Sequence, residues 1–173
     1  PSKGALALPD SAIDARIDYA PYRGRGSYPV QTKRGCAHAC AYCIYPRIEG
    51  ACYRLRKPAD VAAEIFRACE RLGDVSVEIV DSTFNDPQGH AEAICEEIVR
   101  GGARVRLRTM GVNPGGVTDA LILGMRRAGF SQIDCTPDSA SPRIIESLRK
   151  NFDRDRLERG AEAIARAAQD LTL

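Results

Sequence analysis

The sequence lacks any apolar run long enough to form a membrane-spanning helix. Its first ten residues, PSKGALALPD, do not have the charged and then apolar layout of a secretory signal peptide. An excess of one charge is also missing, because 25 basic and 23 acidic side chains leave a net charge of +2. Such a balance gives no strong attraction toward nucleic acid or a membrane surface. We therefore expect a cytoplasmic protein without a membrane partner, whose function depends on a local site.

The cysteines are the unusual feature of the composition. There are seven of them, an odd number, and three lie close together in RGCAHACAYCIYP, residues 34–46. In a reducing compartment, clustered thiols bind metal or do chemistry more often than they form disulfides. This segment is therefore the first candidate for a functional site.

Strand-like and helix-like stretches alternate along the chain from residue 27 onward. Short runs rich in β-branched residues predict strands, and apolar residues at helical spacing predict helices between them. The expected strands are residues 27–32, 75–80, 103–110 and 131–136. The expected helices are residues 58–73, 90–102, 116–130 and 153–171, with a short helical turn at 142–150.

This alternation indicates one α/β domain, built from right-handed βαβ units around a parallel sheet. Ligands of such sheets gather at the carboxyl ends of the strands, and the cysteine segment follows the first expected strand. Residues 1–27 are rich in proline and glycine, which is typical of a connector and not of a strand or helix of the core.

The spacing Cys36-x-x-x-Cys40-x-x-Cys43 allows three thiols to converge on a small volume. A cubane iron–sulfur cluster has four irons, normally with one cysteine each, so three cysteines leave one iron open. An open iron can bind a substrate or cofactor through that molecule's own donor atoms. The competing interpretation is a zinc site completed by His38 or Cys52, although zinc motifs usually pair their ligands in two separated blocks.

Four residues outside this segment have simpler interpretations. Cys69 and Cys95 fall on apolar helical faces and Cys135 falls on a strand, so we expect them to be buried as small hydrophobic residues. His90 falls near the start of a helix, where we expect it to be solvated.

Two groups of basic residues also need an interpretation. One group should form a solvated face: Arg54, Arg56 and Lys57. The other alternates along the third expected strand and shares one face of it: Arg104, Arg106 and Arg108. Because a central parallel strand is usually apolar on both faces, one face of this sheet must be wet or paired. We expect Arg108 to line an incomplete barrel, with contact to a ligand carboxylate as the alternative.

The cysteine triplet lies in a loop that leaves the first strand of an α/β fold, and Tyr42 comes just before its last cysteine. This arrangement resembles the signature of the radical S-adenosylmethionine (radical SAM) enzymes. In that superfamily the open iron of a 4Fe-4S cluster chelates the amino and carboxylate groups of SAM. The fold is a partial parallel (βα) barrel of six units. The resemblance implies that residues 28–173 are the N-terminal part of a radical SAM domain, with about four units.

Further segments are similar to the subclass of this superfamily that carries an upstream cobalamin-binding domain. They are QTKRGC, YPRIEG, DSTFNDP, GVNPGG and DSASPRIIESLRKNF. That domain is not in this chain, so any use of cobalamin would depend on a domain outside it. In this subclass a methyl group can reach an unactivated carbon through the corrin.

The resemblance implies roles for individual residues of the cysteine loop. Cys36, Cys40 and Cys43 would hold the 4Fe-4S cluster. The backbone around Tyr42 and Ile44 would meet the adenine of SAM.

It also implies roles at two strand ends. Asp81 and Ser82 lie after the second expected strand, where many members contact the SAM amino group through a Gly-Gly-Glu segment that is absent here. Asp138 and Ser139 lie after the fourth, where members commonly contact the ribose or carboxylate. The alternative for Asp81 and Asp138 is that each caps the following segment.

The implied activity is that of a radical SAM enzyme, in which an electron from the reduced cluster breaks a carbon–sulfur bond of SAM and gives a 5′-deoxyadenosyl radical. Such an enzyme needs an electron donor, such as a flavodoxin or ferredoxin. Two alternatives remain, a methylthiotransferase that modifies transfer RNA and a non-catalytic iron–sulfur electron-transfer module. The second would need four cysteine ligands and no SAM site.

Overall fold

The computed structural model describes residues 16–22, 24, 26–73 and 75–167 of the chain. Most of the expected connector, including residues 1–15, lies outside the described residues. Within its described part, Ala20–Tyr22 form a 3-10 helix, η2. The ring of Tyr19 lies 5.2 Å from that of Tyr28, which connects this segment to the core.

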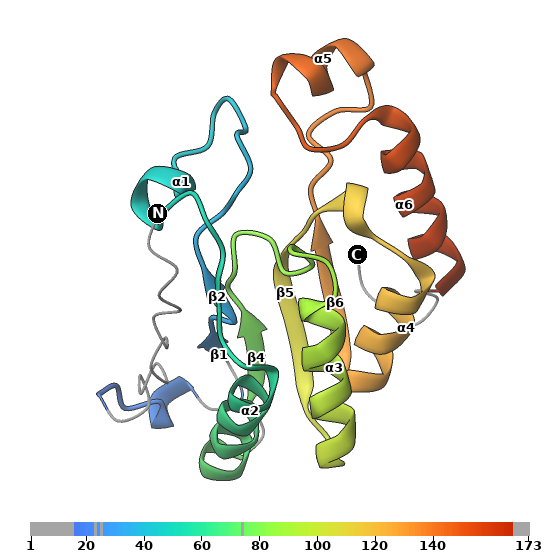
Figure 1. Cartoon of the computed structure of the whole chain (residues 1–173). Coiled ribbons are helices and arrows are strands. Elements are labelled where there is room, and N and C mark those ends of the chain that lie inside the picture. The colour runs from blue at the N-terminus through green and yellow to red at the C-terminus, as the bar shows by residue number, and fades with distance from the viewer. Residues whose placement is uncertain (1–15, 23, 25, 74, 168–173) are drawn as a thin grey trace.

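The centre of the fold is a sheet of four parallel strands in the order β1-β4-β5-β6 (Figure 1). The strands are β1 (Ser27–Val30), β4 (Ser76–Ile79), β5 (Arg106–Val112) and β6 (Phe130–Cys135). The predicted parallel α/β sheet of about four units is confirmed. Because all four strands run in one direction, their carboxyl ends meet at one edge of the sheet.

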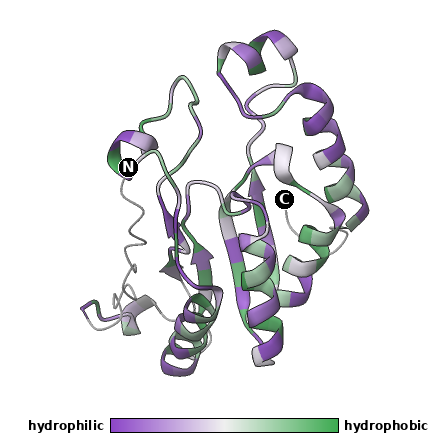
Figure 2. Cartoon of the chain, in the orientation of Figure 1, coloured by the Kyte–Doolittle hydropathy of each residue, from purple (hydrophilic) through white to green (hydrophobic). Residues whose placement is uncertain are grey.

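The predicted helices, three between strands of the sheet and two after β6, match their predicted positions within a few residues. They are α2 (Pro58–Leu72), α3 (His90–Gly101), α4 (Asp119–Ala128), α5 (Pro142–Ser147) and α6 (Arg154–Ala167). Pro58 starts α2 where its missing N–H is not needed, and Thr118 caps α4 by accepting a hydrogen bond from the Leu121 N–H at 3.1 Å. Figure 2 shows hydrophilic residues along much of α2 and α6, as expected for surface helices.

The core lies between one face of the sheet and the helices. Strand residues that point to this face are fully buried, among them Val77, Ile79, Leu107 and Ile133. They pack against helix residues such as Ile65, Ile94, Ile122 and Met125. Burying each of these side chains stabilises the fold by about 1.5–3 kcal/mol relative to exposure.

The opposite face of the sheet is polar, which explains the arginines of β5. Glu78 of β4 lies directly opposite Arg108 in the strand register. The Arg108 guanidinium donates to the Glu78 carboxylate at 2.5 Å and to the Ser27 hydroxyl at 3.1 Å. Burial alone would raise the pKa of Glu78, but the hydrogen bonds from Ser27 and Arg108, together with the charge of Arg108, lower it. The geometry supports charge lining an incomplete barrel, and Arg108 is not one of the residues that line the cavity described below.

The prediction that Arg54, Arg56 and Lys57 form a solvated face is wrong for Arg56. Arg56 is buried, and its guanidinium lies 2.6 Å from the carboxylate of Glu64, itself buried in α2. Arg56 also donates to the carbonyl of Gln31 at 2.8 Å. Lys57 is exposed as predicted, whereas Arg54 is half-buried and donates to the carbonyl of Glu49. The pairing of Arg56 could not be read from sequence because its partner lies on the next helix.

Three short elements around the cysteine segment were not predicted. They are β2 (Lys33–Arg34), β3 (Arg54–Leu55) and α1 (Tyr45–Ile48). Strands β2 and β3 pair antiparallel beside the main sheet and enclose the cysteine segment. Elements of two to four residues are too short to show a period of their own.

Candidate functional site

The cysteine loop, residues 36–43, is closed at its base by backbone contacts. Gly35 has φ +87°, and a Cβ there would lie 2.1 Å from the carbonyl oxygen of Cys52, so only glycine fits. The N–H of Cys36 donates to the carbonyl of Gly50 at 3.1 Å. At the far side of the loop, the N–H of Ala41 donates to the carbonyl of Leu148, just after α5, at 2.9 Å. The loop is therefore held at both sides.

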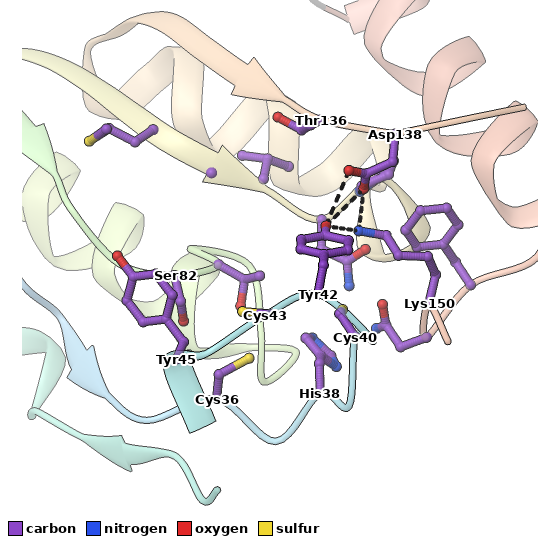
Figure 3. Close-up of a pocket in the computed structure, with 18 residues that line it drawn as sticks. Cys36, His38, Cys40, Tyr42, Cys43, Tyr45, Ser82, Thr136, Asp138 and Lys150 are labelled. Atoms are coloured by element: carbon purple, nitrogen blue, oxygen red, sulfur yellow. Dashed lines mark hydrogen bonds and ion pairs between the residues drawn. The ribbon is translucent and has the colours of Figure 1, made fainter. Parts of the chain in front are cut away.

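All three cysteines of the loop line one cavity of about 290 Å³ (Figure 3). The rest of the lining comes from the loop itself, from Tyr45 at the start of α1, and from the segments after β4, within and after β5, after β6 and after α5. In Figure 1, α1 and α5 lie beyond the carboxyl ends of the strands. The cavity is thus at the edge of the sheet where the sequence predicted a ligand site.

The three thiols fit a cluster better than a single ion. Within the described ranges, no group of three or more His, Cys, Asp or Glu residues is placed to hold one metal ion. A cubane cluster instead takes one thiolate on each of three different irons, so its ligands lie farther apart than those of a single ion. Cys36 is buried, Cys40 and Cys43 are half-buried, and burial raises the pKa of the Cys40 thiol. The predicted ligands are therefore brought to one cavity with their thiols on the same loop.

The zinc alternative finds no support in the described residues. Cys52 is exposed and does not line the cavity. The His38 ring does line it, but its Nε2 lies 2.9 Å from a carboxylate oxygen of Asp86. The hydrophobic interpretation of the other cysteines agrees with the structure, since Cys95 is buried and Cys69 and Cys135 are half-buried against the core.

Burial is the main cause of the raised pKa of two interior thiols, Cys95 and Cys135. Burial raises the pKa of Cys95 to about 12 and that of Cys135 to about 11. Neither Cys95 nor Cys135 is among the described residues that line the cavity of the cysteine loop. The candidate chemistry is thus confined to the cysteine loop.

Asp81 is not among the described residues that line the cavity, and its predicted contact with SAM stays a prediction. Its carboxylate accepts hydrogen bonds from the Thr32 N–H at 2.8 Å and from the Thr32 hydroxyl. It also pairs with the ammonium of Lys33 at 2.9 Å, and both side chains are almost fully buried. Nor does Asp81 cap a helix, because α3 begins only at His90. Its role is to hold the segment that leads from β1 into the cysteine loop.

Ser82 and Thr83, which follow Asp81, do line the cavity. The buried Thr83 hydroxyl lies near Tyr53 but makes no hydrogen bond of good geometry to the described residues. Gly111 of β5 lies beside this segment, and a Cβ there would lie 3.1 Å from the Ser82 carbonyl. The end of β4 therefore offers polar groups that a ligand can satisfy.

Tyr42, Asp138 and Lys150 form a polar cluster on the opposite wall (Figure 3). The Tyr42 hydroxyl donates to the Asp138 carboxylate at 3.1 Å, and the Lys150 ammonium donates to the Tyr42 hydroxyl at 2.9 Å. Lys150 also pairs with Asp138. Burial alone would lower the pKa of Lys150, but the hydrogen bonds with Asp138 and Tyr42 raise it above its ordinary value. Asp138 has φ +60°, an uncommon conformation for a residue other than glycine that is often found at functional sites.

Two predicted contacts are not placed in the cavity wall. Ile44 is 59% exposed, and neither it nor Ser139 is among the described residues that line the cavity. Their predicted contacts with SAM stay predictions.

Conversely, Lys150, Met110 and Asn113 line the cavity and were not predicted as site residues. The rule that ligands gather after parallel strands would have found Asn113, whereas Lys150 lies beyond a short helix and gives no such signal.

His90 is buried, which corrects the expectation of a solvated residue. Its Nε2 lies 3.4 Å from the carbonyl of Thr32, beside the pair formed by Lys33 and Asp81. Burial and the charge of Lys33 lower the pKa of His90. The first residue of α3 therefore packs beneath the segment that leads into the cysteine loop.

The family model described as the Radical SAM superfamily matches residues 30–172. The chain belongs to the radical SAM superfamily. This confirms the resemblance that the cysteine triplet indicated, and it agrees with the parallel sheet and the position of the cavity.

Curated relatives of this radical SAM chain are methylthiotransferases. The tRNA-2-methylthio-N(6)-dimethylallyladenosine synthase of Thermobifida fusca (strain YX) is 29% identical over 150 residues, which cover 80% of this chain and 29% of that protein. The ribosomal protein uS12 methylthiotransferase RimO of Syntrophobacter fumaroxidans (strain DSM 10017 / MPOB) is 29% identical over 164 residues. These cover 88% of this chain and 36% of that protein. The chain thus spans 29% and 36% of the length of these relatives.

Solved structures of radical SAM enzymes share the fold. The methyltransferase TsrM from Kitasatospora setae, with cobalamin and a [4Fe-4S] cluster bound, has a TM-score of 0.77 at 24% identity, covering 87% of this chain and 31% of that one. The cobalamin-dependent enzyme OxsB, with aqua-cobalamin and S-adenosylmethionine bound, has a TM-score of 0.69 at 17% identity, covering 85% and 23%. Across the described residues, no helix is long and apolar enough to cross a membrane.

The burial of His90 predicts that the stability of the radical SAM chain depends on pH. The unfolded chain takes up a proton at His90 below about pH 6.5, whereas the folded chain, whose pKa is lower, resists it. The stabilisation is therefore complete above that pH and is lost as the pH falls below it, by at most about 1.4 kcal/mol per pH unit. Urea unfolding at a series of pH values, compared with His90→Asn, measures it. Equal pH dependence in both proteins would contradict the prediction.

Proposed function

We propose that this chain forms the cluster-holding and SAM-binding part of a radical SAM enzyme. The observation that carries the proposal is that Cys36, Cys40 and Cys43 line one cavity together with the carboxyl ends of the strands. Membership of the superfamily supports the same assignment. An electron-transfer module is less well supported, because three cysteines leave one iron for an outside ligand.

The three thiols would hold three irons of a 4Fe-4S cluster, on a loop that is fixed at both sides. When bound, the cluster and SAM supply a one-electron cleavage of a carbon–sulfur bond that generates a 5′-deoxyadenosyl radical. The chain's own part is to bind, orient and exclude water. Apolar lining from the buried Val112 and Phe152 serves that last purpose, since water in the cavity would favour competing reactions.

The charged groups of the cavity suit the two charged ends of an amino acid. Lys150 carries the one ammonium or guanidinium among the described residues that line it, and its side chain is only 9% exposed. It can pair with the carboxylate of SAM while the Ser82 and Thr83 end of β4 accepts hydrogen bonds from the amino group. Tyr42, at the rim, offers an aromatic face to the adenine.

Two outcomes of the reaction have support, and they differ in their cofactors. Methyl transfer with cobalamin is supported by the five sequence segments that resemble the cobalamin-associated subclass, and the fold is shared with TsrM. Methylthio transfer, to RNA or to a ribosomal protein, is supported by sequence similarity to the two curated relatives. Substrate and electron donor would be bound by the full-length enzyme, of which this chain covers about a third at most in these comparisons.

Anaerobic reconstitution with iron and sulfide tests the cluster and the SAM site. We expect about four irons and four sulfides per chain, and a change in the cluster's electron paramagnetic resonance spectrum when SAM is added. Cys36→Ala, Cys40→Ala and Cys43→Ala should each abolish cluster assembly. Cys52→Ala, which changes an exposed cysteine outside the cavity, is the matched control and should load normally. A cluster whose spectrum does not respond to SAM would refute the proposal.

Lys150→Gln tests how the cavity holds SAM. Loss of a charge-assisted hydrogen bond costs about 1.5–3 kcal/mol, so the dissociation constant for SAM should rise by about ten-fold or more. Calorimetric titration of the loaded protein measures the change. Lys57→Gln, at an exposed position that is not part of the cavity lining, should bind SAM normally. Unchanged SAM affinity in Lys150→Gln would rule out the assigned contact.

The full-length protein distinguishes the two outcomes. If cobalamin is used, incubation with hydroxocobalamin followed by gel filtration should leave the corrin absorbance with the protein. If methylthio transfer to RNA is the activity, the protein should instead bind RNA, and its affinity should fall steeply with salt concentration. Retention of cobalamin without RNA binding supports the first outcome, and the reverse result supports the second.

A further inference from the structure

A chain of polar contacts runs from the first cysteine of the loop into the strand ends. The Tyr53 hydroxyl lies 3.9 Å from the Cys36 sulfur and 3.1 Å from His38 Nε2. The same nitrogen of His38 lies 2.9 Å from Oδ2 of Asp86. Asn113 donates to that carboxylate oxygen at 2.7 Å. The functions described above assign no role to Tyr53, His38 or Asp86.

Ligation of iron by Cys36 fixes the direction of these hydrogen bonds. A bound thiolate carries no proton, so the Tyr53 hydroxyl must be the donor in its contact with sulfur. The oxygen of Tyr53 then accepts from His38, and the Asp86 carboxylate can only accept. One proton on His38 Nε2, shared between the Tyr53 oxygen and the Asp86 carboxylate, completes this series of polar contacts.

The far end of this series of polar contacts is held by a reciprocal pair of hydrogen bonds. The Asn113 N–H donates to the side-chain oxygen of Asn85 at 2.8 Å, and the Asn85 amide donates back to the Asn113 carbonyl at 2.9 Å. Asn85 and Asn113 are both buried. This reciprocal pair locks the segments after β4 and β5 together and so fixes Asp86. His38 lies in a loop and not in a strand or helix, but its contacts with Asp86 and Tyr53 hold its ring in place.

We propose that Tyr53 donates a hydrogen bond to the Cys36 thiolate and so raises the reduction potential of the cluster. His38 and Asp86 are positioning residues that keep the hydroxyl aimed at sulfur. The inference rests on the proposed function, because it requires a cluster on Cys36. Reduction adds negative charge that is shared with the ligand sulfurs, and a hydrogen-bond donor to sulfur stabilises the reduced state more than the oxidised one.

The test is the midpoint potential of the reconstituted cluster, measured by redox titration with electron paramagnetic resonance. Tyr53→Phe removes only the hydroxyl, so the potential should become more negative with unchanged iron and sulfide content. Tyr45→Phe is the matched control, because Tyr45 lines the same cavity and makes no hydrogen bond to a cysteine in the described part of the chain. Its potential should equal that of the unmodified protein.

A second pair of variants keeps the test decisive if Tyr53→Phe fails to assemble a cluster. His38→Ala should shift the potential in the same direction by a smaller amount, and His38→Gln, which keeps an N–H donor, should restore part of the shift. Unchanged potentials in the variants that load would overturn the inference and leave the cluster assignment intact. Failure of the unmodified protein to form a cluster would overturn both.

Discussion

The buried pair of Lys33 and Asp81 is the interaction on which the site depends. It ties the end of β4 to the two residues that precede Arg34 and Gly35, and so fixes where the cysteine loop begins. A pair this deeply buried survives only because its remaining hydrogen-bonding groups are satisfied, here by Thr32 and the carbonyl of Phe84. Removing one partner would leave a buried charge, at a cost of about 3–5 kcal/mol.

A second buried ion pair also supports the base of the loop. Arg56 and Glu64 pair in the interior, and Arg56 also contacts the backbone at Gln31, one residue before the Thr32 that Asp81 holds. Two buried ion pairs, from α2 and from the end of β4, therefore converge on three consecutive residues. A loop that presents ligands to a cluster must have its base fixed within a fraction of an ångström, and buried charges specify position more strongly than apolar contacts do.

The parts of the fold that a local pattern encodes could be predicted from sequence. Periods of two and 3.6 residues located four strands and the helices between them, and the spacing of three cysteines located the site. Contacts between distant residues leave no such pattern. Asp81 has the position expected of a ligand contact, yet it faces inward because Lys33, 48 residues earlier, needs a buried anion. Arg56 and His90 looked solvated for the same reason, since their buried surroundings come from other elements.

The cavity itself is assembled from segments that are far apart in the chain. Tyr42 comes from the cysteine loop, Asp138 from the segment after β6 and Lys150 from the segment after α5, yet their polar atoms contact one another. Together with the backbone hydrogen bond from Ala41 to Leu148, this cluster closes the cavity on the side away from β4. The Lys150 ammonium has three N–H donors, and the contacts with Tyr42 and Asp138 use two of them. A ligand that carries its own carboxylate can accept a charge-assisted hydrogen bond from the third without displacing either internal partner.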